Sequence, residues 1–244
     1  MKRLIIIIIV IVVAVTGVVI TTKSLKSQQL KLAVDEIPPK ENRLKWYAAK
    51  SKEQGIAEVQ IEAPMVEYLG TASRNLNEAI SEYSLVIAKP VLSQTIIDET
   101  DSIVTWYKFE IVEFVSKTDK SACMTCPIPS PPNEMFPVSE NEFVAGKYGG
   151  LVEVDGIKIK SIDKQFPDFK TGKEYLLFIS RYDNGAATIG IGPNSIFSVD
   201  TDGNLYRFNN SPSALKEEIE HEHGKSLLNV RAWAKQIRDS KKVQ

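Results

Sequence analysis

Residues 84–115 read SLVIAKPVLSQTIIDETDSIVTWYKFEIVEFV, and this stretch decides the fold class. Two runs rich in β-branched and aromatic residues, 84–93 and 103–115, flank the acidic segment Asp98–Ser102. Such runs on either side of a polar turn are typical of antiparallel strands, so we expect a long β-hairpin. Pro90 interrupts the first run, and because proline cannot donate to a sheet ladder it predicts an edge strand or a bulge there.

A second hairpin is expected in residues 151–160, LVEVDGIKIK. Its centre, Asp155-Gly156, suits a two-residue type I′ turn, which fixes the register of the two strands. This register pairs apolar residues on one face and opposite charges on the other: Val154 with Ile157, Val152 with Ile159, and Glu153 with Lys158. We expect the first face to be core and the second to face water.

Further strands are expected at residues 174–180 (EYLLFIS), at 186–192 (AATIGIG) and in a closing hairpin at 195–208 (SIFSVDTDGNLYRF). Seven or more short strands separated by turns predict one antiparallel β-barrel or β-sandwich, in a mainly β (α+β) fold.

Helices are expected on both sides of these strands. Before them, residues 40–54 form a helix that ends at Gly55, residues 56–62 a strand, and residues 75–82 a second helix. After them, Ser211 and Pro212 begin a helix over residues 212–223, which Gly224 terminates. Ser226 caps a last helix, whose apolar stripe we expect to dock on the barrel: Leu227, Val230, Ala234 and Ile237, with Trp233 beside it.

The N-terminus is the most apolar part of the chain. Lys2 and Arg3 precede an almost unbroken apolar run of 17 residues, Leu4–Ile20, which makes about 25 Å of helix, close to the thickness of a bilayer core. The run is longer than the core of a usual signal peptide and no small-residue cleavage site follows it, which favours an uncleaved signal anchor. A cleaved signal peptide is the alternative, and the protein would then be secreted.

These elements divide the chain into four parts. We expect a transmembrane signal anchor at 1–22, with residues 4–22 in the membrane, and a stalk with a short helix and strand at 23–74. The β-barrel domain follows at 75–210 and a helical hairpin at 211–244. Because the short basic head of a first span usually stays in the cytoplasm, we expect a single-pass membrane protein with an extracytoplasmic body.

Composition describes an ordinary folded body. With 43% hydrophobic residues, 25% charged residues and a formal net charge of −1, the chain can bury a sizeable core. Lysine and arginine are scattered rather than clustered. Since nucleic-acid binding needs a basic patch for the phosphates, nucleic acid is excluded as a partner.

Several segments between residues 75 and 208 resemble a group of uncharacterised bacterial exported β-domain proteins. The similar segments are NLNEAISEYSLVIAKPV, IVTWYKFEIVEFV, GGLVEVDGIKI, FPDFKTGKEYLLFIS and GPNSIFSVDTDG. The resemblance implies a small antiparallel barrel of the OB or netrin-like type and no known activity. This chain departs from the group at Ala88-Lys89, where a glycine is usual.

Cys123 and Cys126 are the two cysteines of the chain and lie in a proline-rich loop, CMTCPIPSPP. A redox C-x-x-C pair normally opens a helix, which Pro127 and Pro129 disfavour here. In an oxidising compartment the favoured interpretation is a disulfide that staples the loop. A redox-active pair, a metal site and free thiols are the alternatives.

His221 and His223 are the two histidines, in the segment Glu220–His223. With Cys123 and Cys126 they would supply four zinc ligands, which makes all four weak metal candidates. On a helix, however, residues two apart point to nearly opposite sides. We therefore expect both histidines at a solvated helix end rather than in a site.

Two acidic turns also resemble sites at first sight. The glycine spacing of Asp200–Asn204 is wrong for a calcium loop, so this segment is expected to be a hairpin turn. Asp98, Glu99 and Asp101 are expected at a hydrated hairpin tip rather than as catalytic carboxylates.

The motifs of the common hydrolases, kinases and nucleotide-binding enzymes are absent from the sequence. The prediction is a non-enzymatic, membrane-anchored extracytoplasmic β-barrel module without a cofactor. It would act by binding or scaffolding, with another envelope protein or a surface ligand as partner. The alternative is an envelope thiol–disulfide or zinc-binding protein that uses Cys123 and Cys126.

Overall fold

The computed structural model describes residues 38–39, 41–64, 75–118, 131–135, 138–190, 192–210 and 213–241. These residues form two β-sheets and four α-helices, which confirms the mainly β fold class. The expected anchor and both cysteines lie outside the described residues. Within the described ranges, no helix has the length and apolar character needed to cross a membrane.

The larger sheet has seven strands in the order β10-β9-β7-β2-β3-β4, with β8 paired to β7. All of its ladders are antiparallel. Its strands are β2 (Ser84–Ile97), β3 (Ile103–Ser116), β4 (Glu142–Tyr148), β7 (Tyr175–Arg181), β8 (Ala187–Ile189), β9 (Phe197–Val199) and β10 (Leu205–Arg207).

The long hairpin expected from residues 84–115 is confirmed as β2 and β3, which pair from Leu85↔Ser116 to Ile97↔Ile103. The ladder shifts register between Pro90 and Leu92, so proline sits at a bulge as expected. β2 pairs with β7 only from Ser84 to Ala88, so Pro90 lies beyond that ladder.

The larger sheet curls so that β4 approaches β8. Val144 and Ala186 form one isolated parallel bridge, and the Val144 amide donates to the Gly185 carbonyl at 3.2 Å. No ladder of the described strands joins these two edges, so the sheet is not a closed barrel.

The smaller sheet has the order β1-β6-β5, from β1 (Glu58–Glu62), β6 (Ile157–Ile162) and β5 (Gly150–Val154). The predicted hairpin register is confirmed for all three residue pairs. Asp155 and Gly156 have φ values of 51° and 80°, as a type I′ turn requires. The parallel pairing of β1 with β6 was not predicted.

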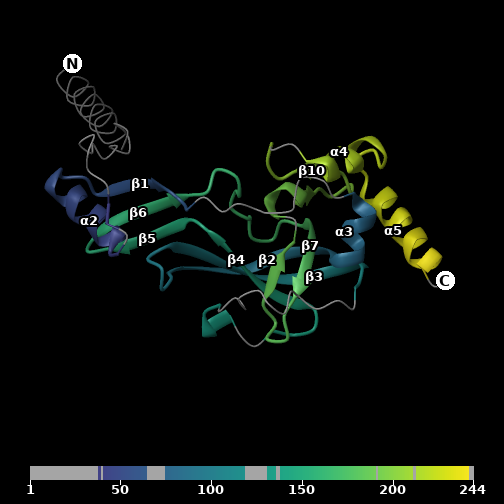
Figure 1. The fold of residues 1–244 in the computed structure, drawn as a ribbon, viewed down its shortest axis with the longest axis horizontal. Helices are drawn as coiled ribbons and strands as arrows, with labels where there is room; N and C mark the ends of the chain where they lie inside the picture. Colours follow the sequence, from purple (N-terminus) through teal and green to yellow (C-terminus); the bar gives the residue numbers. More distant parts are fainter. Residues whose placement is uncertain are drawn as a thin grey trace, which may run out of the picture.

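Helix α2 (Arg43–Glu53) packs against the smaller sheet, and the two lie together at one end of the molecule (Figure 1). Residues 41–64, which belong to the expected stalk, are therefore folded onto the β5–β6 hairpin. Their shared core is Leu44, Ala48, Val59, Ile61, Ile103, Val154, Ile157 and Ile159.

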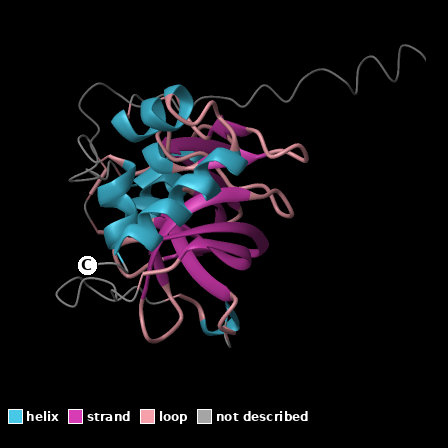
Figure 2. Ribbon diagram, turned by 90° about the vertical axis from the view of Figure 1, so that its right-hand side faces the viewer, coloured by secondary structure: helices cyan, strands magenta, loops and turns pink. Residues whose placement is uncertain are grey.

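Helices α3 (Leu76–Glu82), α4 (Ala214–His221) and α5 (Leu227–Lys241) pack against the larger sheet at the opposite end. Viewed from that end, they lie in front of the strands (Figure 2). Strand β7 is buried on both faces, which explains its unbroken apolar run. Leu176 and Phe178 face the helices, whereas Tyr175, Leu177 and Ile179 face the aromatic core inside the curl.

The two C-terminal helices differ in part from expectation. Helix α4 begins at Ala214 with Ser213 in the N-cap position and ends at His221, two residues earlier than expected. The expected cap, Ser211-Pro212, lies outside the described residues. In α5, Leu227, Val230 and Ala234 are buried against the sheet, which confirms docking for this part of the expected stripe, whereas Ile237 is only half-buried.

Candidate functional site

The end of helix α4 places its two histidines in different environments. Helix α4 ends at His221, and its C-cap residue Glu222 still has right-handed helical dihedral angles. Gly224, with φ 60°, then turns the chain toward α5. His221 is exposed, as expected for a solvated helix end. His223 is only 7% exposed, so the expectation of a solvated position was wrong for it. The reason is that the helix ends before His223, and the turn carries its ring inward.

The position of His223 is fixed by α5. Its ring meets Trp233 edge to face, with ring centroids 5.4 Å apart. Its carbonyl oxygen accepts hydrogen bonds from the Asn229 side-chain amide at 3.0 Å and the Ser226 amide at 3.1 Å. The ring atom Nε2 is buried and has no hydrogen-bond partner among the described residues.

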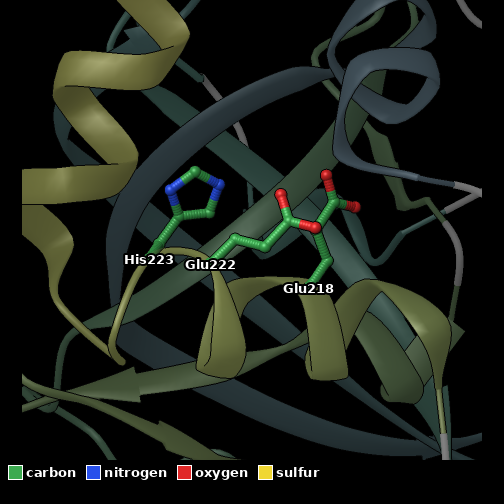
Figure 3. A group of neighbouring side chains, drawn as sticks. All are labelled: Glu218, Glu222 and His223. Carbon is green, nitrogen blue, oxygen red and sulfur yellow. The ribbon is translucent and has the colours of Figure 1, made fainter.

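Two carboxylates lie beside this nitrogen. Glu218 and Glu222 are four residues apart and therefore share one face of α4. One ligand atom from each carboxylate and one from His223 lie within 4.8 Å of one another. Figure 3 shows the outer edge of the imidazole, which carries Nε2, turned toward the two carboxyl groups. We call these three residues the Glu–Glu–His cluster; they are the described residues that could hold a metal ion.

Glu218 is half-buried and links α4 to α3. Its Oε2 accepts a hydrogen bond from the Leu76 amide, the first helical amide of α3, at 2.6 Å. Burial raises the pKa of Glu218, and the negative charge of Glu222 acts in the same direction. The Leu76 amide and His223 act in the opposite direction, because each favours the charged carboxylate.

Glu220, which the sequence placed beside the histidines, points elsewhere. Arg207 donates to both of its carboxylate oxygens, at 2.6 and 2.7 Å, and this pairing lowers the pKa of Glu220. His223 is one of the candidate ligands expected from the sequence, whereas Glu218 and Glu222 are not. The i, i+4 spacing of Glu218 and Glu222 was the available signal for a shared helix face.

A separate cleft of about 400 Å³ lies between the β5–β6 hairpin and the loop that follows it. Its lining combines apolar and charged residues: Lys147, Gly150, Leu151, Lys160, Ser161, Ile162, Asp163, Lys164, Phe166, Pro167 and Asp168. The Lys147 side chain is only 3% exposed, and its ammonium group donates to Asp168 at 2.6 Å. The same ammonium lies 6.0 Å from the centre of the Phe166 ring.

Lys160 differs from the other two lysines of this cleft. Lys147 pairs with Asp168 and Lys164 pairs with Glu62, whereas Lys160 has no acidic residue in register on either neighbouring strand. On the outer face of the smaller sheet, Lys158 lies in register with Glu58 on β1 and with Glu153 on β5. Lys160, two residues on, lies in register with Gln60 and Leu151.

The acidic turns are structural. Asp98 accepts the Thr100 and Ser102 amides within its own turn. Asp101 was expected to be hydrated, but its Oδ2 accepts a hydrogen bond from the Leu44 amide at the start of α2, at 2.9 Å.

The second acidic turn behaves as predicted. Asp200 accepts the Asp202 and Asn204 amides, which confirms a hairpin turn. The hydrogen bond from the Asn204 side chain lowers the pKa of Asp200.

Cys123 and Cys126 lie outside the described residues, so their pairing stays a prediction. The chain matches no known protein family and no curated protein.

Proposed function

We propose that this protein is a membrane-anchored, extracytoplasmic and non-enzymatic β-domain that binds a ligand or partner in the cell envelope. The apolar run Leu4–Ile20, which follows the basic residues Lys2 and Arg3, supports the anchor. The observation that carries the binding role is the cleft beside the β5–β6 hairpin. Its volume falls within the range of small-molecule sites.

The chemistry of the cleft favours an anionic ligand with an apolar part. Lys160 offers an ammonium group without a carboxylate opposite it in register, whereas the ammonium of Lys147 is already paired with Asp168. Leu151 is 51% exposed and, with Pro167, offers apolar surface beside these charges. A carboxylate or phosphate next to an apolar group matches this arrangement.

A non-enzymatic role fits the environment of the buried histidine. General-base catalysis on a serine or cysteine needs a hydrogen bond between the nucleophile and the base. Nε2 of His223 has no such partner among the described residues.

Amide chemical-shift titration of the full chain in detergent micelles tests the cleft. The probes are inorganic phosphate and N-acetyl-leucine, which joins a carboxylate to an apolar side chain. We expect N-acetyl-leucine to shift the amides of Leu151, Lys160 and Ile162, and Lys160→Gln to remove the effect. The matched control is Lys158→Gln, on the same strand and face, which should bind as the wild type does. Equal shifts in wild type and Lys160→Gln would contradict the proposal.

We propose further that the larger sheet is an OB or netrin-like barrel left partly open, as in the exported β-domain group that the sequence resembles. Its strands follow one another in space as β2-β3-β4-β8-β7 and return to β2. The isolated parallel bridge between β4 and β8 stands where this ring closes. Partly open five-stranded rings of this kind are found among OB folds.

A further inference from the structure

We infer that Glu218, Glu222 and His223 bind a divalent transition-metal ion, with zinc as the best-fitting ion. The inference begins at the imidazole of His223. A buried ring nitrogen without a hydrogen bond destabilises a fold, because it has lost its contact with water and gained none in return. In this chain Nε2 is such a nitrogen, and the side chain that carries it is 93% buried, since it is 7% exposed.

The ring edge that carries this nitrogen faces two carboxyl groups, which can act as metal ligands (Figure 3). The carboxylates of Glu218 and Glu222 each place an atom within 4.8 Å of the imidazole ligand atom. Neither carboxylate forms a hydrogen bond with the ring. Three electron-pair donors that converge in this way, one of them a buried nitrogen without a hydrogen bond, are an arrangement that a metal ion would satisfy.

The ligand set selects the class of ion. Imidazole nitrogen and carboxylate oxygen together suit zinc and its first-row neighbours, whereas calcium and magnesium prefer oxygen alone. Zinc lies about 2.0 to 2.2 Å from such ligands, so the three groups would move closer together on binding. Glu222 is exposed, which gives the ion a route from solvent and leaves room for water as a further ligand.

The surroundings of the cluster hold two of its members in place. Glu218 Oε2 already accepts the Leu76 amide, and Oε1 has no hydrogen-bond partner among the described residues. Trp233 packs against the His223 ring from α5. Such outer contacts orient metal ligands. The ion would therefore join α3, α4 and α5, so its binding should stabilise the fold.

Calorimetric titration of the full chain with zinc chloride in detergent micelles tests the site. The background is Cys123→Ser/Cys126→Ser, which removes thiolate ligands. We expect one zinc ion per chain and a rise in melting temperature with zinc. Glu222→Gln and His223→Gln should each weaken binding at least about tenfold. His221→Gln, which alters the exposed neighbour, should leave binding unchanged.

Two further measurements keep the test decisive. Because His223 is buried, its variant needs a folding check by far-UV circular dichroism, whereas Glu222 is exposed and its variant should fold normally. Cobalt in place of zinc should give visible d–d absorption clearly above that of free cobalt ion in the parent, and a much smaller increase in Glu222→Gln. No zinc binding by the parent, or equal binding by the parent and Glu222→Gln, would overturn the inference.

Discussion

Lys216 on α4 is fully buried, although lysine is rarely found in a core. Its ammonium group donates to the Asn209 carbonyl at 3.1 Å and to the Asn209 side-chain oxygen. Burial lowers the pKa of Lys216 to about 8, and the positive charge of Arg207 acts in the same direction. Between pH 8 and the unfolded value of 10.5, the folded chain therefore holds fewer protons than the unfolded chain.

This difference predicts a pH-dependent stability. Because the unfolded state binds the extra proton, the contribution of Lys216 to the free energy of unfolding rises as pH increases from 8 toward 10.5. From pH 7 to 9.5 the wild type should gain about 2 kcal/mol relative to Lys216→Met. Urea unfolding of both proteins at these two pH values measures this difference in the free energy of unfolding. Burial raises the pKa of Tyr107 and Tyr175, so these groups stay neutral in the folded chain in this range. Parallel pH profiles would contradict the prediction.

The exact end of helix α4 also explains why part of the candidate site could not be predicted from the sequence. A continuous helix would have put His221 and His223 on opposite sides, and from the sequence both were expected in water. The helix instead ends at His221, and Gly224 reverses the chain. Helix ends are hard to place to within two residues from sequence. In this chain, the position of the helix end determines whether His223 faces solvent or Glu218.

At the scale of elements, the predicted hairpins are local and the missed contacts are not. The β5–β6 register follows from one Asp-Gly turn and two apolar pairs, all within ten residues. The pairing of β1 with β6 joins residues about 100 positions apart, and the sequence of neither strand indicates which strand it pairs with. Likewise, Asp101 accepts the Leu44 amide of α2 from 57 residues further along the chain, and no local sequence pattern predicts this contact.

The junction between the two sheets gives a prediction at this scale. Gly150, at φ 135°, begins β5, and a Cβ there would lie 2.4 Å from Thr105 Oγ1 and 2.6 Å from Thr95 Cγ2. Gly150→Ala should therefore lower the free energy of unfolding by about 2 to 4 kcal/mol.

The matched control is Gly156→Ala in the β5–β6 turn. Gly156 also has a positive φ, 80°, but its Cβ would meet no atom within 4 Å, so the expected cost is about 1 kcal/mol. Urea unfolding compares the two variants. Equal losses would mean that the contact with Thr95 and Thr105 does not constrain the junction.

For the whole molecule, the long β2–β3 hairpin connects the two ends. Ile103 near its turn contributes to the core beneath α2, whereas Leu85 and Val115 contribute to the core beneath α3, α4 and α5. The cleft lies beside the smaller sheet, whereas the Glu–Glu–His cluster lies at the end of α4. Figure 1 shows the smaller sheet and α4 in different parts of the molecule. A single body thus carries two separate candidate sites.

The proposed role in the cell envelope requires the folded body to lie outside the cytoplasm. The most direct test is labelling of Lys173→Cys, an exposed position, in the full chain with both native cysteines changed to serine. Intact bacterial cells that express this variant are treated with a membrane-impermeant maleimide, and the membrane fraction is then washed with alkaline carbonate. We predict labelling in intact cells and retention of the labelled chain in the membrane. Labelling only after the cells are lysed would place the body in the cytoplasm and contradict the account.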